Sequence, residues 1–364
     1  MFRRIFKMAE ESLSKKPRIA PLIGTHNGHF HADEALAVYL LRLLPTYSQS
    51  PLVRTRDPAV LATCHTVVDV GGEYEASKNR YDHHQRTFST TFPGYNTKLS
   101  SAGLVYMHFG QSIIAQHLSL PAEHGNVGLI YNKLYADFVE AIDANDNGVS
   151  VYETDALKNA GVEKKFKDGG ITIPSIVNDM NNPSTEEEEK LDEDGLFARA
   201  SEFIGSVFLR KMKHACSSWL PARETVKQAY AGRKEIHTSG KIMVLPQGGV
   251  PWKEHLYNFE KEAAAAGAGE EAEVAYVLYP ESATEGSKWR VQAVSVNEGS
   301  FVSRKPLPEK WRGVRDADLD GVLAAETAEP KIPEGAVFVH ASGFIGGHKT
   351  REGAYAMAVH GLQL

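Results

Sequence analysis

The sequence contains few cysteines, no long apolar run and no excess of positive charge, and each absence excludes a class of protein. Two cysteines, Cys64 and Cys216, are too few for a disulfide framework and are typical of a reducing compartment. No run of about 18 apolar residues is available to span a bilayer, so we do not expect an integral membrane protein. The 40 basic and 46 acidic residues give a net charge of −6, which argues against a general basic coat for nucleic acid. Any phosphate-bearing ligand must therefore be held locally.

The chain of 364 residues is long enough for two domains of common size. Residues 1–18 are expected to form a tail or a targeting segment, although acidic residues interrupt the pattern of a mitochondrial transit peptide. We predict a first α/β domain over residues 19–190, a helical connector over 191–234 and a smaller second domain over 235–364.

Apolar and helix-forming stretches alternate through the first predicted domain. Strands are expected at 19–24, 52–55 and 66–70, with helices at 33–44 and 57–63. This order is typical of a parallel, doubly wound sheet, and the fold class is therefore predicted as α/β. The second domain has shorter β-type runs and is predicted as a smaller α/β unit, with strands at 241–245, 273–279, 289–296 and 336–340.

Four segments carry imidazoles or carboxylates toward the presumed rim of the first sheet, where ligands gather at the carboxyl ends of strands. They are residues 25–34 (THNGHFHADE), Asp69, the triplet Asp82-His83-His84, and the pair Asp143 and Asp146 near the end of a predicted helix over 125–145. Taken alone, each segment also fits an ordinary polar loop, strand end or helix end. Together they supply more ligands than one metal ion needs.

We therefore predict two divalent ions bridged by Asp69. Mixed imidazole and carboxylate ligands favour manganese, with magnesium or zinc as alternatives. A water between two such ions ionises near neutral pH and can attack phosphorus, so no serine or cysteine nucleophile is required. Asp82 is expected to orient an imidazole rather than bind metal. The residues alone leave open whether His26 or His29, and whether Asp143 or Asp146, is the ligand.

The stretches THNGHFHADEALA, VVDVGG, YDHHQR and AIDANDNG resemble the motifs of the DHH phosphoesterase superfamily, in particular its Myg (melanocyte-proliferating-gene) branch. The resemblance covers nearly the whole chain from Ile19 onward. It implies catalytic roles for Asp69 and for His84, which would face the scissile phosphate. It also implies a set of metal contacts, namely His26, His31, Asp33, Asp69, His83 and Asp143. The first motif departs from the usual pair of aspartates because His31 stands at the earlier position, which removes one negative charge from the site.

A second element resembles the Gly-Gly-His motif of the DHH-associated substrate-binding domain. Gly346, Gly347 and His348 precede a predicted helix, and exposed backbone donors at a helix N-terminus form an anion site. Arg304 and Lys305 are further candidates for phosphate contacts. These five residues are the expected substrate-binding set.

The resemblance implies a metal-dependent phosphodiesterase, namely a 3′–5′ exonuclease acting on single-stranded RNA in mitochondria or the nucleus. Two other functions fit the residues. One is a phosphohydrolase acting on pyrophosphate or short oligonucleotides, and the other is a non-catalytic module that binds metal or nucleotide. Substrate length separates the two enzymes, because a long strand needs a basic, aromatic-lined groove and a small substrate needs only a closed pocket. No oligomeric state is predicted.

Overall fold

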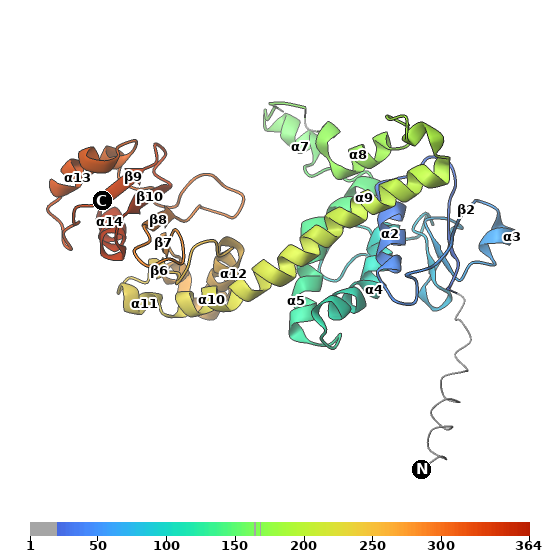
Figure 1. The fold of residues 1–364 in the computed structure, drawn as a ribbon, viewed down its shortest axis with the longest axis horizontal. Coiled ribbons are helices and arrows are strands. Elements are labelled where there is room, and N and C mark those ends of the chain that lie inside the picture. The colour runs from blue at the N-terminus through green and yellow to red at the C-terminus, as the bar shows by residue number, and fades with distance from the viewer. Residues whose placement is uncertain (1–19, 164, 168) are drawn as a thin grey trace, which may run out of the picture. The chain divides into compact units, whose positions relative to one another are not determined.

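The computed structural model describes residues 20–163, 165–167 and 169–364, without the side chain of Thr154, so the predicted tail or targeting segment lies outside the described residues. The chain divides into two compact units, Met1–Ala215 and Cys216–Leu364 (Figure 1). This division falls inside the predicted helical connector. The domain boundaries that we predicted from the sequence stay predictions.

The first unit is built on a five-stranded sheet with the strand order β2-β1-β3-β5-β4. The pairs β2–β1, β1–β3 and β3–β5 are parallel, whereas β4 pairs with β5 in the antiparallel direction at the edge. The predicted α/β fold class is confirmed. The strands are β1 (Ile23–Thr25), β2 (Leu52–Arg54), β3 (Thr66–Val68), β4 (Tyr74–Glu75) and β5 (Arg80–Tyr81).

Helices cover both faces of this sheet (Figure 1). On one face Leu61 of α3 packs against Cys64 and Val67. On the other face α2 contacts β3, and it also packs against α4 and α9. The helices are α2 (Ala32–Arg42), α3 (Pro58–Leu61), α4 (Ser101–Leu118), α5 (Gly125–Leu134), α6 (Glu140–Asp146), α7 (Thr154–Asn159), α8 (Ile173–Asp179) and α9 (Glu193–His214).

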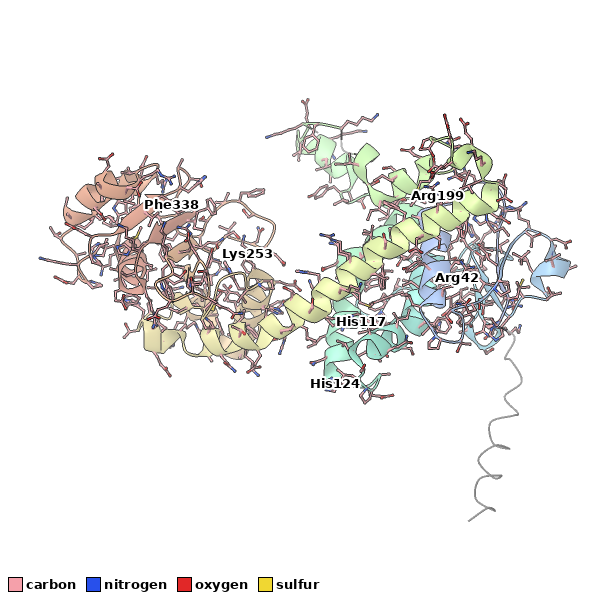
Figure 2. All side chains as sticks on the ribbon, viewed as in Figure 1. Arg42, His117, His124, Arg199, Lys253 and Phe338 are labelled. Atoms are coloured by element: carbon pink, nitrogen blue, oxygen red, sulfur yellow. The ribbon has the colours of Figure 1, made fainter. Side chains whose placement is uncertain are left out.

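Two contacts fix helix α2 in this arrangement. Gly205 on α9 leaves room for the ring of Tyr39, and a Cβ atom at this glycine would overlap that ring. At the end of α2, Nη2 of Arg42 (Figure 2) donates a hydrogen bond to the carbonyl oxygen of Ser50 at 3.1 Å. Helix α2 is therefore held by packing along its length and by a polar contact at its end.

Residues 125–146 are helical throughout, as predicted for 125–145, but the helix is not a regular α-helix. A π-helical turn, Tyr135–Val139, separates α5 from α6. The wider turn shifts the direction in which the residues of α6 face relative to those of α5. This shift matters for the metal centre because α6 carries both Asp143 and Asp146.

The second unit has its own five-stranded sheet, with the order β6-β7-β8-β10-β9. Only β6 and β7 are parallel, and the other neighbours are antiparallel. Helices α13 and α14 pack on one face around Trp311, and α10 and α12 pack on the other around Trp252. The four predicted strands correspond to β6 (Ile242–Val244), β7 (Tyr276–Pro280), β8 (Trp289–Ala293) and β9 (Ala336–Val339). The other elements are α10 (Leu220–Ala231), α11 (Arg233–Ile236), α12 (Lys253–Ala263), α13 (Asp316–Ala324), β10 (Ile345–His348) and α14 (Arg351–Gln363).

Within the described part of the chain, every helix is too short or too polar to cross a membrane.

Candidate metal centre

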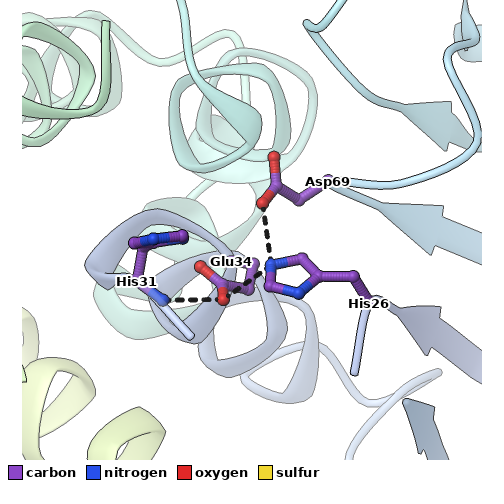
Figure 3. A group of neighbouring side chains, drawn as sticks. All are labelled: His26, His31, Glu34 and Asp69. Carbon is purple, nitrogen blue, oxygen red and sulfur yellow. Dashed lines mark hydrogen bonds and ion pairs between the residues drawn. The ribbon is translucent and has the colours of Figure 1, made fainter. Parts of the chain in front are cut away.

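The imidazole of His26, in the loop after β1, lies between two carboxylates, those of Glu34 in the first turn of α2 and Asp69 at the end of β3 (Figure 3). Nε2 of His26 lies 3.0 Å from Oε1 of Glu34 and 3.3 Å from Oδ2 of Asp69. The same oxygen of Glu34 accepts a hydrogen bond from the backbone N–H of His31 at 2.8 Å. His26, His31, Glu34 and Asp69 each offer a ligand atom, and these atoms lie within 4.8 Å of one another.

Asp69 occupies the sharp turn at the carboxyl end of β3. Its φ of 58° lies in the left-handed region, and Gly71 and Gly72 follow with positive φ as well. Aspartate enters this region at lower cost than most residues, and strained backbone of this kind clusters at functional sites. Oδ1 of Asp69 accepts a hydrogen bond from Oγ of Ser101 at 3.0 Å. The turn therefore presents a carboxylate whose position is fixed by Ser101 of helix α4.

The two imidazoles after β5 have different surroundings. The side chain of His83 is buried, and its Nε2 lies 3.3 Å from Oδ1 of Asp69 and 3.0 Å from Oδ2 of Asp146. The side chain of His84 is 62% exposed, and its Nδ1 lies 2.7 Å from Oδ1 of Asp82. Asp82 also accepts hydrogen bonds from the backbone N–H groups of Gly72 and His84. Asp82 thus orients His84, while His83 joins the carboxylate cluster.

Asp143, the expected ligand on α6, lies in a different hydrogen-bond network. Its Oδ1 accepts from the N–H and Oγ–H of Ser100 and from the N–H of Gly103, and its Oδ2 accepts from the hydroxyl of Tyr135. These donors include backbone groups of the first turn of α4, so Asp143 caps that helix. Despite these donors, burial raises the pKa of Asp143 to about 7.

Asp146 takes the place in the cluster that Asp143 was expected to fill. Asp33, His83 and Asp146 form a group whose ligand atoms lie within 4.8 Å of one another. A third such group contains Asp69, His83 and His84. The three groups overlap at Asp69 and His83, so they form one continuous cluster rather than separate sites.

Buried atoms without partners show that the cluster fits a cation. Asp33 is 1% exposed, and neither of its carboxylate oxygens has a hydrogen-bond partner among the described residues. Burial raises the pKa of this carboxyl group, and the negative charges of Asp69 and Asp146 add to the effect. Nδ1 of His83 is likewise buried without a hydrogen bond to any described residue, whereas its Nε2 faces Asp69 and Asp146. An unpaired buried carboxylate is strongly unfavourable, and a divalent ion would remove that penalty.

The imidazoles hold protons at the positions that a metal would take. Burial lowers the pKa of His26, but hydrogen bonds to Asp69 and Glu34 outweigh it and raise this pKa to about 10. For His83, burial is likewise outweighed by contacts with Asp146 and Asp69, which raise its pKa to about 9. Burial opposes ionisation of Asp69, yet contacts with both imidazoles lower its pKa. Metal binding would therefore release protons from the site.

His29, the alternative to His26, lies outside the cluster. Its Nε2 is 2.9 Å from Oδ1 of Asn178, on helix α8. Nearby, Asn181 accepts from the N–H of Phe30 and donates to its carbonyl oxygen, both at 2.9 Å. Asn178 and Asn181 are 149 and 151 residues further along the chain than the loop residues that they contact. No local sequence pattern predicts them.

The cluster opens into a cavity of about 770 Å³. Its lining includes His26, His31, Asp33, Asp69, Asp82, His83, His84 and Asp146. Two cationic side chains, Arg56 and Lys98, also line the cavity. Neither residue was expected at the site from the sequence.

The chain is similar to known proteins over most of its length. A family model named MYG1_exonuc, described as an uncharacterised protein family (UPF0160), matches residues 22–362. The chain belongs to this family.

Three relatives illustrate how far this similarity extends. A protein of Bos taurus named MYG1 exonuclease is 46% identical over 355 residues, which cover 95% of this chain and 86% of the relative. The Homo sapiens protein of the same name is 46% identical over 344 residues, covering 93% of this chain and 85% of the relative. A protein of Dictyostelium discoideum named MYG1 protein is 40% identical over 341 residues, covering 93% of this chain and 96% of the relative.

In the second unit, Gly346 and Gly347 do not stand at a helix N-terminus as expected, because they belong to strand β10. Gly347 pairs with Arg290 on β8, and a Cβ atom at this glycine would overlap the guanidinium group. His348 is fully buried, with Nε2 3.0 Å from the carbonyl oxygen of Pro333 and Nδ1 accepting from the N–H of Thr350. Gly347 thus allows close approach of the Arg290 side chain from the neighbouring strand.

Arg304 and Lys305 lie elsewhere in the second unit. Both terminal nitrogens of Arg304 are 2.8 Å from carboxylate oxygens of Glu260, and Nζ of Lys305 donates to the carbonyl oxygen of Leu362 at 2.7 Å. Both residues line a cavity of about 500 Å³ whose lining does not include Gly346, Gly347 or His348. The structure thus does not bring the five expected substrate contacts into one pocket, and their roles stay predictions.

Proposed function

We propose that the protein is a metal-dependent exonuclease that hydrolyses phosphodiester bonds in RNA from the 3′ end. The observation that carries the proposal is the cluster around Asp69, in which the two buried oxygens of Asp33 lack hydrogen-bond partners among the described residues. The names of the bovine and human relatives, MYG1 exonuclease, support a nucleic acid as the substrate. Membership in the DHH phosphoesterase superfamily is part of the proposal and rests on the motif resemblance.

We assign two divalent ions to the cluster. The first would be held by His26, His31, Glu34 and Asp69, and the second by Asp33, His83 and Asp146 with Asp69 shared. Mixed nitrogen and oxygen ligands favour manganese. Such a pair of ions supplies a water that ionises near neutral pH and positive charge for the phosphate oxygens.

His84 is assigned to the substrate rather than to the metals. Its ring is exposed at the cavity, and its Nδ1 lies 2.7 Å from Asp82 and 3.7 Å from Asp69. The hydrogen bond to Asp82 raises the pKa of His84, which favours the protonated ring. Protonated His84 can donate a hydrogen bond from its free Nε2 to a phosphate oxygen. Asp82 fixes the direction of that donor.

The second unit is proposed to hold the RNA strand while the first unit cuts it. This role, the 3′–5′ polarity and a location in mitochondria or the nucleus rest on the resemblance to the Myg branch.

Cleavage of single-stranded RNA labelled at its 5′ end tests the proposal. Protein stripped with a chelator and reloaded with Mn²⁺ should shorten the RNA one nucleotide at a time while the label remains on the long products. Asp69→Asn should reduce the rate by at least about two orders of magnitude, because the shared ligand is weakened. Asp179→Asn, which changes an exposed aspartate on α8, is the matched control and should leave the rate unchanged.

Parallel assays with single-stranded DNA, dinucleotides and pyrophosphate define the substrate class. Cleavage of pyrophosphate alone would show that the protein is a small-molecule phosphohydrolase and not an exonuclease. Inactivity on every substrate with Mn²⁺, Mg²⁺ and Zn²⁺ would leave a binding module.

A further inference from the structure

Lys98 is an unusual lining residue of the metal-centre cavity. Its side chain is half-buried, and its Nζ lies 5.6 Å from the ring centroid of Phe88. Beyond this ring, the ammonium group has no hydrogen-bond or ion-pair partner among the residues that the structure describes. A lysine that borders an acidic cluster is expected to pair with one of its carboxylates. Lys98 instead keeps its donors free at the cavity.

The backbone holds Lys98 firmly in this position. Nδ2 of Asn147 donates to the carbonyl oxygen of Lys98 at 2.9 Å, and Thr91 forms an antiparallel bridge with Lys98. Two residues further on, Ser100 is hydrogen-bonded to the buried Asp143. Asn147 directly follows Asp146, so Lys98 is tied to the segment that supplies a proposed metal ligand. Its ammonium group is therefore presented from an ordered backbone.

Arg56 stands beside the opposite part of the cluster. It follows β2, and its Nη2 lies 3.2 Å from Nδ1 of His26. One cation thus neighbours His26, while the other is tied to the segment of Asp146. Arg56 is exposed and already has this contact, whereas Lys98 is half-buried with unused donors. Lys98 is the better candidate for a ligand contact.

The balance of charge at the cavity depends on whether metal is bound. The lining contains four carboxylates, Asp33, Asp69, Asp82 and Asp146, which exceed the two cations. Glu34, which the first ion would also contact, brings the number of carboxylates to five. Two divalent ions together with Lys98 and Arg56 would outweigh these five negative charges by one positive charge. An anion would then be attracted only to the metal-loaded site.

We propose that Lys98 is a phosphate-binding residue of the metal centre and that its ammonium group contacts a non-bridging oxygen of the substrate phosphate. Arg56 supplies the second positive charge at the same cavity. This inference rests on the proposed function, and it assigns the phosphate contact to the first unit itself. Lysine is a common phosphate ligand because its ammonium group is a compact point charge with three donors.

The test measures binding separately from turnover. Wild-type protein loaded with Mn²⁺ is titrated with adenosine 5′-monophosphate in a calorimeter, and its metal content is counted by mass spectrometry. Lys98→Gln should weaken nucleotide binding by about 10- to 100-fold, as expected for the loss of a charge-assisted contact. Its metal content should stay at the wild-type value. Lys98→Arg should recover most of the affinity.

The matched control is Lys78→Gln, which removes an exposed lysine of the same unit that pairs with Glu73. Its nucleotide affinity should equal that of the wild type. Wild-type protein without metal should not bind the nucleotide, because the carboxylates then dominate the cavity. Circular dichroism before each titration checks that the variants are folded. If Lys98→Gln does not fold, Lys98→Arg is titrated in its place.

Three results would overturn the inference. They are an unchanged nucleotide affinity in Lys98→Gln, a loss of bound metal in this variant, and no nucleotide binding by the metal-loaded wild type. RNA cleavage with an unchanged KM in Lys98→Gln would also reject the role of Lys98, while the exonuclease proposal would stand. Metal-dependent nucleotide binding that needs Lys98, without cleavage of any nucleic acid, would reject the exonuclease and retain the phosphate site.

Discussion

Replacing Asp33 by asparagine should have opposite effects on stability with and without metal. Asp33 is 1% exposed, and its two carboxylate oxygens have no hydrogen-bond partner among the described residues. In metal-free protein the ionised carboxylate is therefore a source of instability. Asparagine keeps the shape of the side chain and removes the charge, so the metal-free variant should be more stable than the wild type.

The size and pH dependence of this effect follow from the buried charge. Burial raises the pKa of Asp33, so the unfolded chain releases this proton at a lower pH than the folded protein does. The metal-free wild type should then lose stability as the pH rises above about 4. At pH 8 the variant should be more stable by about 2 kcal/mol. For a unit of this size that difference raises the Tm by roughly 4–8 °C.

Bound metal should reverse the order of stability of the wild type and Asp33→Asn. An ion present at 100 times its Kd stabilises the folded protein by about 2.7 kcal/mol. Asp33→Asn should lose that stabilisation for the ion that Asp33 holds, so the wild type becomes the more stable protein in Mn²⁺. Urea unfolding at pH 6 and pH 8, with chelator and with Mn²⁺, measures all four conditions, and Asp179→Asn serves as the exposed control. A less stable metal-free variant, or equal stabilisation of both proteins by Mn²⁺, would refute the reasoning.

Three further predictions concern individual contacts. His83→Asn should lower the metal content measured by mass spectrometry, whereas His84→Asn should keep the metal and slow turnover, and the reverse result would exchange their roles. Burial raises the pKa of Asp143 to about 7. Relative to Asp143→Asn, the wild type should therefore lose up to about 1.4 kcal/mol of stability per pH unit between about pH 4 and 7. A stability difference between the two proteins that is the same in urea unfolding at pH 5 and at pH 7 would contradict this. Gly205→Ala should destabilise the protein by about 1–3 kcal/mol through overlap with Tyr39, and thermal melts should show partial recovery on adding Tyr39→Leu.

Local patterns were sufficient to predict several of the elements that carry the metal centre. Short apolar runs ending at a polar residue correspond to β1 and β3, and the helix start at Asp57-Pro58 is observed with Asp57 accepting from the N–H of Ala59. Because parallel strands end at the same edge, His26 and Asp69 could be expected to meet, and they do. His83 was expected at the same rim and does lie near Asp69, but the strand that places it there, β5, was not predicted.

The choice between Asp143 and Asp146 could not be made from periodicity. The π-helical turn at Tyr135–Val139 changes the phase of α6, and this turn has no clear sequence signal. Glu34 was not among the expected metal contacts, and its contact with His26 depends on how β1 and α2 meet. Gly346 and Gly347 fit a turn as well as a strand, and the neighbouring Arg290 side chain explains why glycine is needed at position 347 within β10.

The most direct test of the central claim is a titration of chelator-stripped protein with Mn²⁺, in which native mass spectrometry counts bound ions and RNA cleavage is measured on the same samples. The metal centre described here predicts two ions per chain, cleavage that appears as the second ion binds, and loss of both in Asp69→Asn. Full cleavage by metal-free protein, or two bound ions that are unaffected by Asp69→Asn, would contradict the account.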